Sequence, residues 1–234
     1  MLEIENLNSF YGNVQVLRDF SVKVAAGEIV CLLGRNGAGK TTALKSILGL
    51  VAPKSGRRLL DGRDISALPA EDIPRHGIGY VPQGRRLFKD LTVRENLEVG
   101  LMTRGSGRAV LDRAISYFPK LTERLGQQAG TLSGGEQSMV AIARALCVDP
   151  RVIMLDEPTE GLMPSMIQAI REVLTKLRSE GVAVLLVEQR IDAVLPVADR
   201  IAFMDQGHVQ AEANVADVKA DPALVQRYLG VGHG

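Results

Sequence analysis

Two glycine-containing stretches and one acidic pair carry residue types that could do chemistry on a phosphate. The first stretch, Gly34 to Thr41, matches the pattern G-x-x-x-x-G-K-[ST]. Its glycines free the backbone to wrap amide groups around phosphate oxygens. Lys40 adds a positive charge, and the hydroxyl of Thr41 can bind Mg²⁺. We expect a nucleotide site formed by Gly34, Arg35, Asn36, Gly37, Ala38, Gly39, Lys40, Thr41 and Thr42.

The acidic pair closes the apolar run "VIMLDEP", residues 152–158. Open α/β sheets bind ligands at the carboxyl ends of their strands, where these acids would lie. Asp156 could hold Mg²⁺, and Glu157 could orient or deprotonate an attacking water. A helix-capping acidic pair without catalytic work is the alternative.

The second glycine stretch, "LSGGEQ" at residues 132–137, lies where a helix is predicted to begin. A Ser and two Gly at a helix N-terminus are typical of an anion site. A Ser-capped helix explains the Ser alone, but not the paired glycines. The sequence thus predicts two phosphate-binding stretches in one chain, residues 34–41 and 132–137, and one domain would need only one of them to bind a nucleotide.

The surrounding pattern predicts the elements that position these residues. Alternating apolar positions in residues 2–24 predict antiparallel strands, and the apolar run 28–34 predicts a central parallel strand. A helical pattern starts at Gly39 and stops before Pro53. Strand, glycine-rich turn and helix follow in the order of a P-loop fold.

The middle of the chain has helical periodicity from about 92 to 148. Parallel-sheet signals then resume, with strands at 151–157 and 182–188, a helix at 164–180, and a hairpin at 200–213 turning at Gln206 and Gly207. We predict one α/β domain, with a nucleotide-binding core at 1–83 and 151–234 and a helical lobe at 84–150.

Composition narrows the class of protein. The 234 residues carry 28 basic and 27 acidic side chains, a net charge of +1, so no basic field favours nucleic acid as a partner. The start "MLEIENLNSF" lacks the features of a signal peptide, and no apolar run could span a bilayer. We therefore expect a cytosolic protein, with Cys31 and Cys147 as reduced core thiols.

The P-loop, "LSGGEQ" and "VIMLDE" together, in this order, resemble the ATP-binding cassette (ABC) ATPases over nearly the whole chain. The resemblance implies a RecA-like P-loop core with an N-terminal antiparallel β subdomain and an inserted helical lobe. It also implies hydrolysis of ATP with Mg²⁺. In this family two cassettes meet head to tail, so the second phosphate-binding stretch would serve the partner's ATP. Leu132, Ser133, Gly134, Gly135, Glu136 and Gln137 would form that signature.

The same resemblance implies further site residues. Tyr11 is similar to the aromatic residue that stacks on adenine, with Val16 beside it; a sheet-core tyrosine is the alternative. Gln83, which ends "GYVPQ", resembles the glutamine that contacts Mg²⁺ and the attacking water. The metal ligands would then be Thr41, Gln83 and Asp156.

Two positions depart from the family pattern. "LLVEQR" places Gln189 where most members have a histidine, and "TEGLMP" places Met163 where many have an aspartate. The carboxamide of Gln189 can donate to a γ-phosphate and accept from water, so we expect it to take part in catalysis without titrating. A strand-end residue facing solvent is the alternative.

Four segments narrow the resemblance: "EPTEGL", "LLVEQ", "YVPQGRRLF" and "YLG" at 228–230 are similar to the ATPase subunits of branched-chain amino acid importers. The resemblance implies transmembrane permease subunits, a second ATPase subunit forming a heterodimer (or a homodimer in isolation), and a solute-binding protein acting indirectly. It places the chain peripherally at the cytoplasmic face of the inner membrane. A urea or amide importer, or a soluble ABC ATPase of iron–sulfur assembly, are the alternatives.

Overall fold

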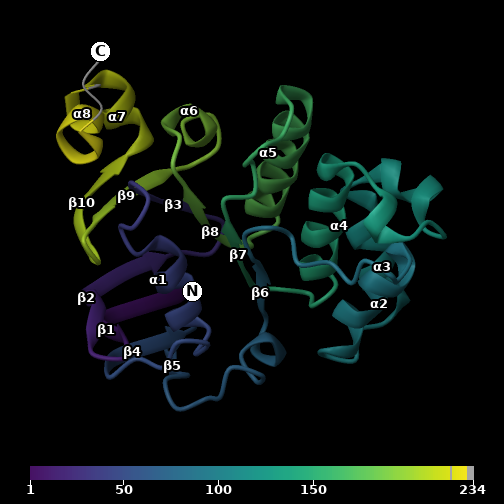
Figure 1. Ribbon diagram of the computed structural model, residues 1–234, viewed down its shortest axis with the longest axis horizontal. Coiled ribbons are helices and arrows are strands. Elements are labelled where there is room, and N and C mark those ends of the chain that lie inside the picture. The colour runs from purple at the N-terminus through teal and green to yellow at the C-terminus, as the bar shows by residue number, and fades with distance from the viewer. Residues whose placement is uncertain (222, 231–234) are drawn as a thin grey trace.

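The computed structural model describes residues 1–221 and 223–230 and contains two β-sheets (Figure 1). The smaller sheet is antiparallel, in the order β2-β1-β4-β5. Its strands are β1 (Leu2–Tyr11), β2 (Val14–Val24), β4 (Ser55–Leu60) and β5 (Arg63–Asp64). The alternation that predicts β1 and β2 is thus confirmed, while β4 and β5 join this sheet without such a pattern.

The larger sheet has six strands in the order β10-β9-β3-β8-β7-β6, and only β10 is antiparallel to its neighbour. Its strands are β3 (Ile29–Leu33), β6 (Ile78–Val81), β7 (Val152–Asp156), β8 (Ala183–Glu188), β9 (Arg200–Asp205) and β10 (His208–Asn214). Because β3, β8 and β7 are neighbours, the segments that follow their carboxyl ends meet at one edge. Those segments are the P-loop, Gln189 and Glu157.

Helices cover both faces of this sheet (Figure 1). Val30 and Leu32 of β3 face a core shared with α1 (Lys40–Ile47) and the smaller sheet. Cys31, between them, faces the opposite core. That second core contains α4 (Gly134–Leu146), α5 (Pro164–Ser179), α6 (Ile191–Val194), α7 (Val215–Ala220) and α8 (Ala223–Leu229). The predicted core thiols are confirmed, since Cys31 and Cys147 are both buried.

Residues 84–150 contain no β-strand, and the predicted helical periodicity is confirmed there. Besides α4 they form α2 (Val93–Met102), α3 (Arg108–Ser116), η2 (Pro119–Arg124) and η3 (Ala129–Thr131), while η1 (Pro74–His76) lies before β6. Helix α2 starts with a capping box between Thr92 and Glu95, which satisfies two free amides. The division into a core and a lobe at 84 and 150 stays a prediction.

The β9–β10 hairpin turns at the predicted residues and reaches the P-loop. Gln206 and Gly207 have φ of 46° and 84°, the two positive values that a tight hairpin turn requires. The amide of Gly207 donates to the carbonyl of Ala38 (2.9 Å), and its own carbonyl accepts from the amide of Arg18 (3.1 Å). A Cβ at Gly207 would overlap the carbonyl of Val16. The tip therefore packs against both β2 and the P-loop.

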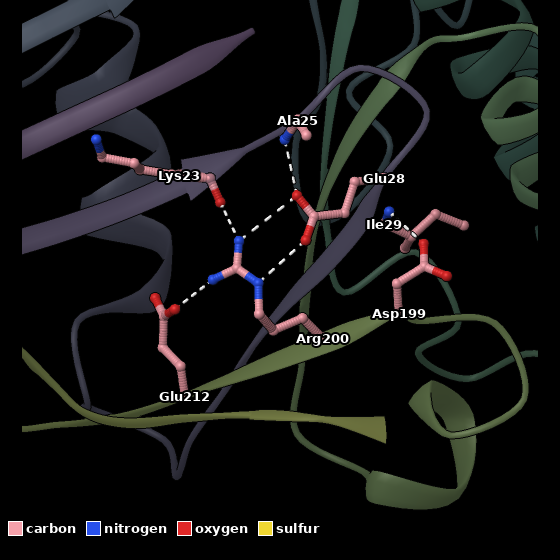
Figure 2. Close-up of polar contacts among 7 residues, drawn as sticks. All are labelled: Lys23, Ala25, Glu28, Ile29, Asp199, Arg200 and Glu212. Carbon is pink, nitrogen blue, oxygen red and sulfur yellow. Dashed lines mark hydrogen bonds and ion pairs between the residues drawn. The ribbon is translucent and has the colours of Figure 1, made fainter. Parts of the chain in front are cut away.

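A charged cluster lies at the opposite, amino-terminal end of the same strands (Figure 2). Arg200, the first residue of β9, donates from Nε to Glu28 (3.0 Å) and from Nη2 to the carbonyl of Lys23 (2.5 Å). Its third nitrogen pairs with Glu212 of β10. One guanidinium thus links the end of β2, the start of β3 and the β9–β10 hairpin.

Candidate nucleotide and catalytic site

The P-loop joins the carboxyl end of β3 to the first residue of α1. Gly37 and Gly39 have φ of 83° and 104°, which residues with side chains rarely adopt. A Cβ at Gly34 would overlap the carbonyl of Met204. Beside the loop lies a cavity of about 330 Å³, and its lining is Val16, Asn36, Gly37, Gly39, Lys40, Thr41, Thr42, Gln83 and Glu157. Residues far apart in the sequence thus border one hollow of the size of a small ligand site.

Lys40 is buried and held inside the loop. Its Nζ donates to the carbonyls of Gly34 (2.8 Å) and Arg35 (3.0 Å) and lies 3.8 Å from a carboxylate oxygen of Glu157. Burial lowers the pKa of Lys40, and the nearby carboxylates oppose that shift. The ammonium group is therefore held by two backbone carbonyls and by an ion pair with Glu157, contacts that an incoming phosphate could replace.

Asp156 ends β7 with only 1% of its surface exposed. Its Oδ1 accepts a hydrogen bond from the Thr41 hydroxyl (3.1 Å), but its Oδ2 has no hydrogen-bond partner among the described residues. Burial raises the pKa of Asp156, and the Thr41 bond opposes the shift. An unpaired buried carboxylate oxygen beside a hydroxyl fits the oxygen ligands that Mg²⁺ takes next to substrate phosphates.

Glu157 is held in a strained conformation between two carboxamides. Its φ of 49° lies in the left-handed region, and its amide donates to the carbonyl of Val187 (2.9 Å). Oxygen Oε2 accepts from Nε2 of Gln189 (2.5 Å) and from Nε2 of Gln83 (3.3 Å). Strain of this kind is characteristic of functional positions. The three residues predicted to carry the chemistry therefore come together.

The signature stretch lies apart from this cavity. Ser133 caps α4 in a capping box: its hydroxyl accepts from the Glu136 amide (3.4 Å), and the Glu136 carboxylate accepts from the Ser133 amide (2.9 Å). The Ser133 hydroxyl also donates to the Glu136 carboxylate (2.7 Å), and this bond, together with that of the Ser133 amide, lowers the pKa of Glu136. A Cβ at Gly135 would lie 2.5 Å from Cε of Met166. Residues 132–137 are not among those lining the P-loop cavity, and α4 lies across β7 and β6 from α1 (Figure 1).

The predicted adenine contacts lie on the smaller sheet. Tyr11 ends β1 and keeps 48% of its surface exposed, so it is not a core tyrosine. Val16 of β2 lines the P-loop cavity. Tyr11 is not among the residues lining that cavity, so stacking of its exposed ring on adenine stays a prediction.

Comparison with known proteins agrees with this geometry. The sequence model described as ABC transporter matches residues 17–160. The chain belongs to the ABC transporter family. It is 42% identical over 232 residues to the high-affinity branched-chain amino acid transport ATP-binding protein BraG of Pseudomonas aeruginosa, covering 98% of this chain and 100% of BraG.

Two further likenesses extend the comparison. The lipopolysaccharide export ATP-binding protein LptB of Haemophilus influenzae is 38% identical over 237 residues, covering 98% of this chain and 97% of LptB. A dimeric ATP-binding cassette, solved in a post-hydrolysis state with ADP and Pi, superposes with a TM-score of 0.83 at 28% identity, covering 92% of this chain and 99% of that one. The chain is thus an ABC ATPase with the cassette fold, and its ATP hydrolysis is coupled to transport.

Two polar contacts of this ATPase are not predicted from the sequence. Glu188, the last residue of β8, is 4% exposed and accepts from the hydroxyl of Thr159 (2.6 Å). Burial raises the pKa of Glu188, and the Thr159 bonds oppose the shift. This contact fixes the loop after Glu157 against the end of β8, directly before Gln189. An acid at the end of an apolar run, as in "LLVEQ", is the signal that could have indicated it.

The second contact joins the segment after Gln83 to the signature helix. Arg85 donates from Nε to the hydroxyl of Ser138 on α4 (2.8 Å). In return Arg144 of α4 donates to the carbonyl of Arg86 (2.9 Å). Arg85 and Arg86 both have positive φ, a rare pair for residues with side chains. The segment that leaves Gln83 is therefore tied to the helix that begins at Ser133.

Proposed function

We propose that this ATPase powers the uptake of branched-chain amino acids through a membrane importer. The observation that carries the proposal is the 42% identity to BraG over the full length of both chains. The segments "EPTEGL" and "LLVEQ" support the same assignment. Export of lipopolysaccharide is the competing function, favoured by the 38% identity to LptB.

In the proposed mechanism the site residues share the binding of ATP and of its metal ion. The P-loop amides and Lys40 bind the β- and γ-phosphates, and Tyr11 and Val16 hold the adenine. Asp156, Thr41 and Gln83 would hold Mg²⁺, which supplies charge neutralisation on the phosphates when it is bound. The unpaired Oδ2 of Asp156 supports this assignment.

The chemical step falls to Glu157. It accepts a proton from the attacking water as the water adds to the γ-phosphorus and the bond to the ADP oxygen breaks. Gln189 and Gln83 orient the Glu157 carboxylate through the bonds to its Oε2. Neither carboxamide titrates, so neither donor is lost as the pH changes.

The signature residues 132–137 act on the nucleotide of a second cassette. Their position outside the P-loop cavity and the dimeric form of a structural neighbour support this role. A mixture of Gly135→Asp and Lys40→Ala proteins tests it: a dimer of the two variants has one intact composite site. We expect turnover to reappear on mixing through the homodimer that the chain forms in isolation, whereas two inactive proteins that stay inactive together would contradict a head-to-tail homodimer of this chain.

The proposed partners are two permease subunits and a second, related ATPase subunit, with a solute-binding protein acting through the permease. The proposed location is the cytoplasmic face of the inner membrane, where the chain would be peripheral. Across the described residues, no helix combines the length and hydrophobicity needed to traverse a bilayer.

Copurification from detergent-solubilised membranes tests the partners directly, because it identifies the permease. The purified complex is then placed in proteoliposomes, and ATP-dependent uptake of labelled leucine is measured beside labelled urea. Leucine uptake that stops with Glu157→Gln supports the proposal. Copurification with lipopolysaccharide-export components, or uptake of urea alone, would overturn the substrate assignment.

A further inference from the structure

The C-terminal helix α8 contacts the P-loop through Arg35. Nε of Arg35 donates to the carbonyl of Leu229 (2.6 Å), and Nη2 donates to the carbonyl of Gly230 (2.8 Å). The two partners lie 194 and 195 residues away in the sequence. Both belong to "YLG", residues 228–230, which have no role in the proposed hydrolysis mechanism. The side chain of Arg35 is therefore turned toward α8 and is not among the residues lining the nucleotide cavity.

The contact has the geometry of a helix cap. The last carbonyls of a helix lack partners within the helix, and they carry partial negative charge that a guanidinium stabilises. Gly230 adopts a φ of 58°, and its amide bonds back to the carbonyl of Gln226 (2.8 Å), which presents these carbonyls to Arg35. A Cβ at Gly230 would overlap the guanidinium.

The other end of this contact is the lysine that binds phosphate. The carbonyl of Arg35 accepts from Nζ of Lys40 (3.0 Å) and from the amide of Ala38 (3.2 Å). The peptide that α8 holds through the Arg35 side chain is thus the peptide that shapes the loop around Lys40. Helix α8 is itself anchored, because Tyr228 stacks on Phe203 of β9 with ring centroids 5.1 Å apart.

We propose that Arg35 is a positioning residue: by tying the P-loop to the carboxyl end of α8, it sets the affinity of the loop for nucleotide. The inference rests on the proposed nucleotide site and adds a determinant of that site's affinity. The proposed effect is on nucleotide binding and not on the chemical step. Between α8 and Gln189 lies a cavity of about 520 Å³, whose walls include Gln189 and Leu229. Helix α8 thus bonds directly to the P-loop, but faces Gln189 across a hollow.

The test is a double-mutant cycle on the full chain, read by calorimetric titration with Mg-ATP and by steady-state turnover. Gly230 does not line the nucleotide cavity, yet the Cβ of Gly230→Ala would displace the guanidinium of Arg35. We expect Gly230→Ala and Arg35→Ala each to raise the Kd and KM for ATP by about three- to tenfold, the size of one modest hydrogen bond, with kcat near the parent value. The double variant should match Arg35→Ala, because both changes break one contact.

Gly105→Ala is the matched control. Gly105 has a φ of 63°, close to that of Gly230, but a Cβ there meets no atom within 4 Å. It therefore reports the backbone cost alone, and its affinity for ATP should equal that of the parent. A Gly230→Ala protein that binds Mg-ATP like the parent while its Tm falls would reduce the contact to a structural cap and overturn the inference. Additive effects in the double variant would overturn it too. Failure of the parent to bind Mg-ATP would instead refute the nucleotide site itself.

Discussion

At the amino-terminal end of the six-stranded sheet, all three guanidinium nitrogens of Arg200 reach an oxygen, whereas at the carboxyl-terminal end Asp156 keeps a buried oxygen without a partner among the described residues. Both residues lie at strand ends of one sheet: β9 begins at Arg200, and β7 ends at Asp156. The two ends therefore differ in whether their buried or charged groups have hydrogen-bond partners.

Neighbouring charges at the amino-terminal end are also paired. Asp199 accepts from the amide of Ile29 (2.9 Å) and from Nη1 of Arg178 (2.7 Å), and Glu28 accepts in addition from the amide of Ala25 (2.7 Å). Figure 2 shows these bonds around the start of β3, except the bond of Arg178, which is not drawn. Satisfied charges of this kind fix strand positions and leave nothing for a ligand to complete.

The carboxyl-terminal end has the opposite character. Asp156 is desolvated, Lys40 is held by carbonyls, and Glu157 is strained. Each arrangement costs stability and would be relieved or used when phosphate and a cation arrive. One end of the sheet thus maintains the fold, and the other is the proposed site of binding and catalysis.

The largest expected effect is that of Glu157→Gln. The carboxamide keeps the shape and loses the base, so turnover should fall by about 10² to 10⁴-fold while Mg-ATP binding persists. Turnover and calorimetric titration measure the two effects. Glu160→Gln is the matched control: Glu160 also accepts from Gln83 (3.1 Å) but is exposed, and we expect near-parent turnover. Equal rates for Glu157→Gln and the parent would require another base.

Asp156→Asn should separate function from stability. Loss of the carboxylate should lower turnover by roughly 10²-fold or more, the order found when one electrostatic contact is removed from an active site. The unfolding free energy should rise at pH 7, because a neutral carboxamide replaces a charge that burial disfavours.

The pH dependence of that gain follows from the raised pKa of Asp156. Between the unfolded value of 3.8 and the higher folded value, the native parent binds more protons than the unfolded chain, so the parent loses stability as pH rises through this window. The advantage of Asp156→Asn should therefore grow over the same window and vanish near pH 4. Urea denaturation from pH 4 to 8 measures this difference in unfolding free energy. A variant less stable than the parent at pH 7 would show that the Asp156 carboxylate does not destabilise the fold.

Gln189 variants should have smaller effects on turnover. Gln189→Ala removes one of two bonds to the Glu157 carboxylate, so we expect a loss of about tenfold with ATP binding kept. Gln189→His should add a pH-dependent limb between about pH 6 and 7, which the parent lacks. Turnover against pH, measured with the permease present, is the readout. Parent-like profiles for both variants would remove Gln189 from the chemistry.

Arg200→Met should have the smallest effect on turnover, namely none per folded molecule. It leaves Glu28 and Glu212 without their cation, so we expect the unfolding free energy to drop by about 1–3 kcal/mol. Arg75→Met is the control, since the Arg75–Asp72 pair is an exposed i,i+3 pair and should change stability by less than about 0.5 kcal/mol. A loss of turnover in Arg200→Met at full folding would mean that the two ends are coupled.

Local signals in the sequence predicted much of this molecule. The strand ends, the P-loop glycines and the adjacent acids Asp156 and Glu157 depend on residues close together in the chain, and their elements are found where the pattern placed them. The predicted helix at 164–180 is observed as Pro164–Ser179, one residue shorter. The helix between β8 and β9 is only Ile191–Val194.

Contacts between distant segments could not be predicted in this way. Arg200 and Glu28 are 172 residues apart, and Arg35 and Leu229 are 194 apart. Their pairing follows from the strand order of the sheet, which a single sequence does not contain. The left-handed backbone of Glu157 is also set by tertiary packing, since nothing in "LDEP" favours a positive φ at a glutamate.

The tip of the β9–β10 hairpin has a consequence for anyone who labels or rebuilds this protein. Hairpin tips are ordinarily places where added residues are tolerated. Here Gly207 bonds to Ala38 of the P-loop and to Arg18 of β2, so an insertion at 206–207 would push on the nucleotide cradle from behind. The loop at Gly105, where a Cβ would meet open space, is the better site for a fluorophore or an epitope. The hairpin tip, although an ordinary place to modify a fold, is thus a position from which an insertion would disturb the P-loop.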